Sequence, residues 1–188
     1  MRLRSLGSQG SHSIRDIVCG MLKLAPEKLK VMTPDVGGGF GTKLFTYREY
    51  ALVTIAAQRL KQPVRWIAER TEHFLGDAQG RDNVTDAELA LDKDGTFLAL
   101  RVKTIANLGA YLQAAGDAFT GNLGTLAGVY KTPAIHADVT GVFTNTNSTR
   151  PYRGNGRPEA AYIIERMIDL AAVALQMDPV ELRRRNTI

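Results

Sequence analysis

The chain has 188 residues, a mass of 20.5 kDa and a formal net charge of +5. Its composition, 44% apolar and 23% charged, is that of a globular protein, which excludes a fibrous or disordered chain. No apolar run approaches the roughly 18 residues that cross a membrane, and no basic stripe is interleaved with aromatic residues, so a membrane span and nucleic-acid binding are both disfavoured.

The first residues and the cysteine count bear on the cellular compartment. Residues 1 to 4 lead into a Ser/Gly-rich sequence instead of the apolar core of a signal peptide. Cys19 is the only cysteine, so no internal disulfide can form, as is usual in a reducing compartment. We therefore expect a cytoplasmic protein.

The first 32 residues predict a strand, a helix and a second strand. Residues 1 to 8 predict a short strand and a polar turn, and apolar residues then recur at helical spacing at Ile14, Ile17, Val18, Met21 and Leu22. Pro26 ends this helix, and residues 28 to 32 alternate as a strand. Cys19 lies inside the helical pattern, where we predict a buried structural thiol instead of a nucleophile.

A glycine loop, residues 33 to 43, follows the second strand and has glycines at Gly37, Gly38, Gly39 and Gly41. Glycine main chain can take positive φ, and its N–H groups can approach an anionic or oxo-bearing ligand; the alternative is a tight strand-to-helix turn. The order Gly41-Thr42-Lys43 is wrong for a Walker A loop. Thr42 also replaces the third glycine of a dinucleotide loop, so an ATPase or NAD enzyme is disfavoured.

The middle of the chain predicts a helix, a strand and a β-hairpin. The helix covers residues 47 to 60, with one apolar face formed by Val53, Ala56, Ala57 and Leu60. A strand is predicted at residues 64 to 68, and two alternating runs between residues 81 and 112 form a hairpin around a turn at residues 92 to 95. Residues 109 to 128 are hard to assign and are consistent with a loop and helix that line a site.

The last third contains a second special loop. A strand at residues 135 to 143 precedes a polar stretch, residues 145 to 158, that combines glycines with fixed charge just ahead of a helix. That helix has a 3.6-residue apolar period, and a final helix is capped by Asp178. No internal repeat or linker divides the chain, and the predicted fold class is α+β with mixed helices and β-hairpins. His12, His73 and His136 are isolated, which disfavours a protein-ligated zinc site.

Taken together, the two loops resemble those of the molybdopterin-binding large subunit of the molybdenum hydroxylases. This family includes xanthine dehydrogenase, aldehyde oxidoreductase and aerobic carbon monoxide dehydrogenase. The matching stretches are residues 36 to 43, residues 152 to 159, residues 178 to 186 and the Ser8-Gln9-Gly10 element. Gln9 and Phe40 are 31 positions apart, and Phe40 and Arg153 are 113 apart, close to the family's spacing. The resemblance implies that residues 1–188 are a single partial domain, a fragment of the molybdopterin-binding domain.

The resemblance also implies roles for individual residues. Gln9 would face an oxo ligand of molybdenum, and the main chain of Gly38, Gly39, Phe40 and Gly41 would approach the cofactor. Arg153 would lie beside the metal, with Gly154 also contacting the cofactor. An amide can donate to an oxo group, a glycine loop presents N–H donors, and a guanidinium stabilises developing negative charge. The family's catalytic glutamate is expected beyond residue 188, so the fragment alone would be inactive.

Departures from the family's subgroups bear on the substrate. The second loop lacks the cysteine that helps hold copper in the carbon monoxide enzymes. Purine hydroxylases have a glutamate where this chain has Leu44, an arginine that is missing near residues 121 to 124, and a stacking aromatic where it has Asn155. Leu44 and Asn155 are therefore predicted to contact an aldehyde or a non-purine N-heterocycle.

The resemblance further implies cofactors and partner subunits. Molybdopterin, in its cytosine dinucleotide form, would carry molybdenum, and electrons would pass to [2Fe-2S] and FAD centres on an iron–sulfur small subunit and an FAD medium subunit. The expected assembly is a dimer of heterotrimers. Two alternatives stay open: a cofactor-docking or assembly scaffold without activity of its own, and a subunit similar to form II carbon monoxide dehydrogenase.

Overall fold

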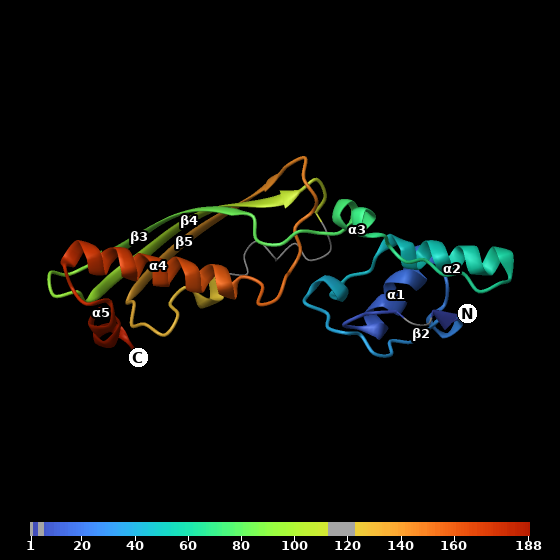
Figure 1. The fold of residues 1–188 in the computed structure, drawn as a ribbon, viewed down its shortest axis with the longest axis horizontal. Coiled ribbons are helices and arrows are strands. Elements are labelled where there is room, and N and C mark those ends of the chain that lie inside the picture. The colour runs from blue at the N-terminus through green and yellow to red at the C-terminus, as the bar shows by residue number, and fades with distance from the viewer. Residues whose placement is uncertain (1, 4–5, 113–122) are drawn as a thin grey trace. The chain divides into compact units, whose positions relative to one another are not determined.

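The computed structural model describes residues 2–3, 6–112 and 123–188. The chain divides into two compact units, Met1–Asp77 and Ala78–Ile188, which we call the N-terminal and C-terminal units. Each unit has a hydrophobic core of its own, and Figure 1 traces both along the chain from blue to red.

The N-terminal unit combines helices with one short pair of parallel strands. Its elements in chain order are β1 (Arg2–Leu3), α1 (Ser11–Leu22), the 3₁₀ turn η1 (Pro26–Lys28), β2 (Lys30–Val31), the 3₁₀ turn η2 (Thr42–Leu44), α2 (Arg48–Leu60) and α3 (Arg70–Gly76). β1 pairs with β2 in parallel, so the predicted strand–helix–strand order is confirmed. The glycine loop follows β2 and ends in η2, just ahead of α2.

The core of this unit is a narrow stripe of α1 packed against the residues that flank the helix. Ile14, Val18 and Cys19 are buried together with Leu6 and Leu29. Cys19 is 2% exposed, which confirms the predicted buried thiol. The predicted helix face was too wide, because Ile17 and Met21 flank the stripe and are 42% and 55% exposed.

Two predictions between residues 47 and 76 are wrong. On α2 the buried residues are Ala51 and Thr54, whereas Leu60, predicted to lie on the apolar face, is 63% exposed at the end of the helix. Residues 64–68 form no strand, although they are mostly apolar, because no strand of the described chain pairs with them. Helix α3 was missed; it begins after Glu69, whose backbone N–H donates to the Glu72 side chain in a capping box.

The C-terminal unit is a three-stranded sheet in the order β3-β4-β5. β3 (Asn83–Leu91) runs antiparallel to β4 (Phe97–Gly109), which runs parallel to β5 (Ala134–Phe143). The predicted hairpin and the third strand are therefore confirmed. In the hairpin turn, the Asp92 carboxylate accepts hydrogen bonds from the N–H groups of Asp94 and Thr96, and Gly95 takes a φ of 86°. The bond from Thr96 is the largest of the effects that lower the pKa of Asp92.

Helix α4 (Arg157–Leu175) covers one face of this sheet, as Figure 1 shows. Alternate residues of β4 point into the core between sheet and helix, and the fully buried side chains there include Phe97, Leu100, Val102, Ile164 and Ile168. The last helix, α5 (Pro179–Asn186), is capped by the Asp178 carboxylate, which accepts from the N–H groups of Val180 and Glu181, as predicted.

Asn186 joins the end of α5 to the hairpin between β3 and β4. Its side chain is buried, and its Oδ1 accepts from the N–H of Phe97 at 2.8 Å. Its Nδ2 donates to the carbonyls of Gly95 and Leu182, both at 2.9 Å. The stretch 178–186, which carries part of the family resemblance, thus has a structural role in this unit. Of the unassigned stretch 109–128, residues 113–122 lie outside the described residues, and Leu123–Thr125 form a 3₁₀ turn.

Candidate functional site

Gln9 lies against the glycine loop within the N-terminal unit. The N–H of Gly41 donates to Gln9 Oε1 at 2.9 Å, and the N–H of Gln9 donates to the carbonyl of Lys43 at 2.9 Å. A Cβ on Gly39 would lie 2.3 Å from Gln9 Cγ, so only glycine at this position lets the amide come so close. The fold therefore brings together two predicted site elements that are far apart in sequence.

The hydrogen bond from Gly41 fixes which end of the Gln9 amide is available. Because Oε1 already accepts from a main-chain N–H, the Nε2 group with its two hydrogens remains as the donor. No described residue accepts a hydrogen bond from it, and the Gln9 side chain is exposed. The amide is thus held as a directed hydrogen-bond donor.

The loop also presents main-chain donors. Within the described part of the chain, the N–H groups of Gly38 and Gly39 donate no hydrogen bond. Gly38, Phe40 and Gly41 all have positive φ, at 93°, 55° and 92°. The Phe40 ring folds back over Gly38, where a Cβ would lie 2.5 Å from Phe40 Cε2. The loop thus holds two main-chain N–H groups that have no acceptor in the described chain, and such donors suit an oxygen-rich or anionic ligand.

Lys43 closes the glycine loop. Its Nζ donates to the carbonyl of Val36 at 2.7 Å, and a Cβ on Gly7 would come within 3.3 Å of that Nζ. Its own carbonyl accepts from Gln9, so one residue links both ends of the loop to the Gln9 element. The sequence analysis included Lys43 in the glycine-loop motif but predicted no role for it. Its position at the end of the glycine run was the only sequence feature that could have indicated that it closes the loop.

The second predicted loop lies in the C-terminal unit, immediately before α4. The N–H of Asn155 donates to the carbonyl of Tyr152 at 2.8 Å, and Gly154, Asn155 and Gly156 have positive φ of 97°, 28° and 85°. Arg153 is exposed at the start of this turn. The glycines thus allow a tight turn that directs the chain into the helix.

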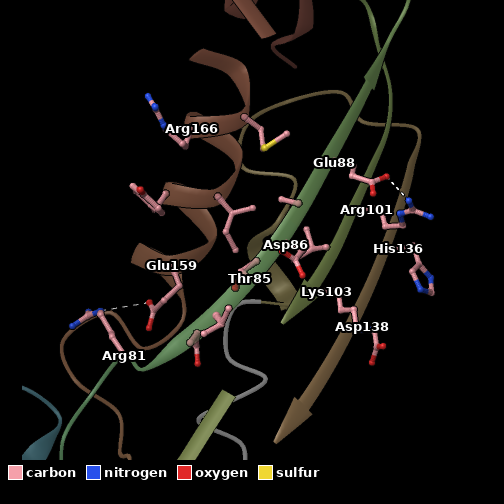
Figure 2. A pocket seen from close by; sticks show the side chains of 17 residues that line it. Arg81, Thr85, Asp86, Glu88, Arg101, Lys103, His136, Asp138, Glu159 and Arg166 are labelled. Carbon is pink, nitrogen blue, oxygen red and sulfur yellow. Dashed lines mark hydrogen bonds and ion pairs between the residues drawn. The ribbon is translucent and has the colours of Figure 1, made fainter. Parts of the chain in front are cut away.

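Arg81 is a residue of this loop's surroundings that sequence reasoning missed. It lies just before β3, and its guanidinium donates to the carbonyls of Tyr152 and Arg153. Figure 2 shows its ion pair with Glu159 in the first turn of α4, with 3.5 Å between Arg81 Nε and Glu159 Oε2. No motif distinguished Arg81 from other arginines, because the contact depends on the fold alone.

The predicted site residues fall into two groups, one in each unit. The N-terminal unit holds Gln9, Gly38, Gly39, Phe40, Gly41 and Leu44, and the C-terminal unit holds Arg153, Gly154 and Asn155. Leu44 is 44% exposed at the end of η2. Asn155 lines a cavity of about 20 Å³ together with Arg81 and Glu159. That the two groups meet around one metal centre stays a prediction.

A larger open groove of about 1150 Å³ runs along β3 and contains none of the predicted site residues. Figure 2 shows charged side chains of the sheet face opposite α4, including the cross-strand ion pair of Glu88 and Arg101. The hydrogen bond to Glu88 raises the pKa of Arg101. Lys103 lies between Asp86 and Asp138 on neighbouring strands, so charges of both signs alternate across this face. Such alternation is typical of a solvated surface.

The clearest electrostatic cluster also lies away from both loops. Arg183 pairs with Asp169 and Glu165, both at 2.8 Å, and the hydrogen bond to Asp169 is the largest factor that raises the pKa of Arg183. The Tyr130 hydroxyl donates to Glu165 at 2.6 Å. Burial, followed by this hydrogen bond, raises the pKa of Tyr130 to about 12. The cluster joins α5 to α4 and is structural.

Residues 5–187 match the family model described as the molybdopterin cofactor-binding domain, and the chain therefore belongs to that family. The match includes both loops and both compact units. Among the described residues, no helix is long and apolar enough to cross a membrane.

Three relatives of this chain are named as dehydrogenases or oxidoreductases. The chain is 37% identical over 185 residues to the carbon monoxide dehydrogenase large chain of Hydrogenophaga pseudoflava, covering 96% of this chain and 23% of that protein. It is 33% identical over 183 residues to the 6-hydroxypseudooxynicotine dehydrogenase complex subunit gamma of Paenarthrobacter nicotinovorans, covering 97% and 23%. The crystal structure of quinoline 2-oxidoreductase from Pseudomonas putida 86 superposes with a TM-score of 0.91 at 36% identity, covering 97% of this chain and 24% of that one. The chain thus spans about a quarter of the length of these relatives.

Proposed function

We propose that this domain holds a molybdenum–pterin cofactor in a molybdenum hydroxylase that oxidises an aldehyde or an N-heterocycle with oxygen derived from water. The observation that carries the proposal is the directed Gln9 amide beside the glycine loop, with its Oε1 tied to Gly41. A simple strand-to-helix turn would not require a glutamine side chain pressed against Gly39. The arrangement therefore supports a binding role for the loop.

The residues present fit such a cofactor. The N–H groups of Gly38 and Gly39, which have no acceptor in the described chain, and the Nε2 group of Gln9 are donors, whereas the oxygen atoms of a molybdenum–pterin group are acceptors. A side chain at Gly38 or Gly39 would collide with Phe40 or Gln9, since a Cβ added at either glycine would come within 2.5 Å of one of them. The glycines therefore let the Gln9 amide and the loop donors lie close together.

The cofactor, when bound, would supply the redox centre that accepts two electrons from the substrate carbon. Gln9 and the loop N–H groups would orient it through hydrogen bonds. Arg153 would stabilise negative charge that develops at the reacting centre, as a fixed guanidinium can in a site shielded from water. Leu44 and Asn155 would line the substrate side of the site.

The remaining parts of the proposal concern the complete protein. The pterin would carry a cytosine dinucleotide, and electrons would leave through [2Fe-2S] and FAD centres on small and medium partner subunits in a cytoplasmic dimer of heterotrimers. Support for partner subunits comes from the relatives' names, which describe a large chain and a complex subunit. A lone buried cysteine agrees with the cytoplasm.

An N-heterocycle or aldehyde is favoured as the substrate over a purine or carbon monoxide. Leu44 offers an apolar contact where a carboxylate would bind a purine, and residues 152–158 contain no thiol for copper. The names of two relatives, quinoline 2-oxidoreductase and 6-hydroxypseudooxynicotine dehydrogenase, describe enzymes of heterocyclic compounds.

Two other functions remain as candidates. The identity to the carbon monoxide dehydrogenase large chain favours a subunit of that kind, in spite of the missing cysteine. A scaffold that docks the cofactor or assembles subunits without activity of its own would need the same glycine loop. Both alternatives make different predictions for the experiment below.

The test uses the protein in its natural complex. We expect molybdenum by elemental analysis, and bleaching of the visible flavin and iron–sulfur absorbance when quinoline or benzaldehyde is added without oxygen. Gln9→Ala should lower molybdenum retention or bleaching, whereas Gln62→Ala, an exposed glutamine without a described partner, should not. Bleaching by carbon monoxide, but by neither quinoline nor benzaldehyde, would favour a carbon monoxide dehydrogenase subunit. A metal-free complex that no substrate bleaches would refute the enzyme and favour the scaffold.

A further inference from the structure

Main-chain hydrogen bonds connect the segment that carries Arg81 to the second loop. The N–H of Gln79 donates to the carbonyl of Ser148 at 3.1 Å, and the N–H of Arg150 donates to the carbonyl of Gln79 at 2.8 Å. Gly80 then passes so close that a Cβ there would lie 2.9 Å from Tyr152 Cβ. This local pairing delivers Arg81 to the main chain of residues 152 and 153.

The Arg81 side chain makes contacts of three kinds with the loop and the helix behind it. Its Nη2 donates to the carbonyl of Tyr152 at 3.4 Å and to the carbonyl of Arg153. Its guanidinium carbon lies 5.0 Å from the centroid of the Tyr152 ring, within range of a cation–π interaction. Its Nε faces Glu159 at 3.5 Å, as Figure 2 shows.

The charge of Arg81 is balanced by Glu159, so Arg81 does not add an unpaired positive charge to the loop. The Glu159 side chain is 19% exposed and that of Arg81 is 30% exposed, which makes this a partly shielded pair. Arg81 itself has a φ of 56°, a conformation that a residue other than glycine adopts at a cost. An arginine that is paired with a carboxylate and donates to two successive carbonyls is well suited to hold the main chain of residues 152 and 153 in one conformation.

We propose that Arg81 is a positioning residue that holds Arg153 in its working direction, an inference that rests on the proposed function. The carbonyl of Arg153 and the preceding peptide group determine where its Cα–Cβ bond points. Gly154, the next residue, has a φ of 97° and allows this peptide to rotate unless something holds it. The planar guanidinium of Arg81 supplies that restraint, because Nη2 binds both carbonyls while Nε faces Glu159, and the single nitrogen of a lysine cannot occupy both positions.

The experiment compares Arg81→Met and Arg81→Lys with the wild-type complex. Arg166→Met is the matched control, because Arg166 is an exposed arginine of the same groove with no described partner. We expect Arg81→Met to keep its molybdenum content and to lose about 10- to 100-fold in kcat for quinoline or benzaldehyde with little change in KM, the cost of a misplaced group. Arg81→Lys should recover part of the loss, and Arg166→Met should lose nothing.

Two readouts separate positioning from a general structural role. If Arg81 works only through Arg153, the double variant R81M/R153M should be no slower than R153M alone. The molybdenum(V) electron paramagnetic resonance signal of the reduced protein should change in R81M and in R153M but not in R166M. Fully additive losses in kcat, or an unchanged signal in R81M, would overturn the inference while leaving the proposed function intact.

A third readout does not depend on the cofactor. Amide hydrogen exchange in residues 150–157 should be faster in R81M than in the wild type and in R166M, because two carbonyl contacts and the ion pair are lost. Equal exchange in all three proteins would refute the positioning role directly. A wild-type complex without molybdenum would refute the proposed function instead, and the role assigned to Arg153 with it.

Discussion

Replacement of Asn186 by alanine should loosen the hairpin between β3 and β4. The Asn186 side chain is 2% exposed and makes three hydrogen bonds, all to main-chain groups, at 2.8, 2.9 and 2.9 Å. A hydrogen bond contributes about 0.5 to 1.5 kcal/mol net, and a buried group left without a partner costs at the upper end of that range or more. The expected loss is therefore about 2 to 4 kcal/mol.

Hydrogen exchange measures this loss where it occurs. A change of about 3 kcal/mol in local stability corresponds to about 100-fold faster exchange, because each 1.4 kcal/mol is a factor of ten. The effect should be concentrated at residues 95–97, since the N–H of Phe97 donates directly to Asn186. Arg184→Ala, a change at an exposed neighbour on the same helix, should leave exchange in the hairpin unchanged.

Asn186→Asp offers a second check on the same reasoning. The substitution keeps an oxygen that can accept from Phe97 but places another oxygen against the carbonyls of Gly95 and Leu182. Buried like charges and partial charges repel, so this variant should be less stable at neutral pH than Asn186→Ala.

If Asn186→Ala speeds exchange at residues 95–97 by less than about threefold, the hydrogen bonds contribute less than their lower range and the reasoning is refuted.

Three further predictions concern other parts of the chain. Gly109→Ala should lower the free energy of unfolding by about 2 kcal/mol or more, because Gly109 has a φ of 74° and the new Cβ would lie 2.3 Å from the carbonyl oxygen of Asn147. A shift of the urea midpoint smaller than that expected for a glycine at an exposed position would contradict this prediction. Since burial raises the pKa of Tyr130 to about 12 from 10.0, its stabilising contribution is complete below pH 10 and is lost as the pH rises through 12. Tyr130→Phe should flatten that part of the stability curve, and an unchanged slope would exclude Tyr130 as its cause. Cys19, 2% exposed, should react with a thiol reagent only on unfolding, and rapid labelling of the native protein would show otherwise.

The sequence predicted elements best where local pattern and tertiary packing agree. The hairpin around residues 92–95 combines alternating strands with a glycine turn, and its confirmed antiparallel pairing follows from both signals. Residues 64–68 are mostly apolar, yet a strand needs a partner, and sequence pattern cannot say whether one is in reach. Helix α3 was missed because its seven residues are too short for periodicity to register.

For the candidate site, glycine runs were visible but the contacts that hold them were not. The conformations of Gly38 and Gly41, both at positive φ, follow from the residue type. By contrast, the bonds of Lys43 to Val36 and of Arg81 to residues 152 and 153 join main-chain carbonyls that carry no sequence signal. Such contacts depend on how the chain folds back on itself, so they could be found only in three dimensions.

The contact between Asn186 and the hairpin has a consequence for biosynthesis. It closes a turn 91 positions upstream, so the growing chain presents an unsecured hairpin until α5 has left the ribosome. At a translation speed of about 5 to 20 residues per second, that interval lasts several seconds. During this interval the main-chain groups of Gly95 and Phe97 that Asn186 binds lack their partner, and premature termination within α5 would leave a product in which they stay unpaired.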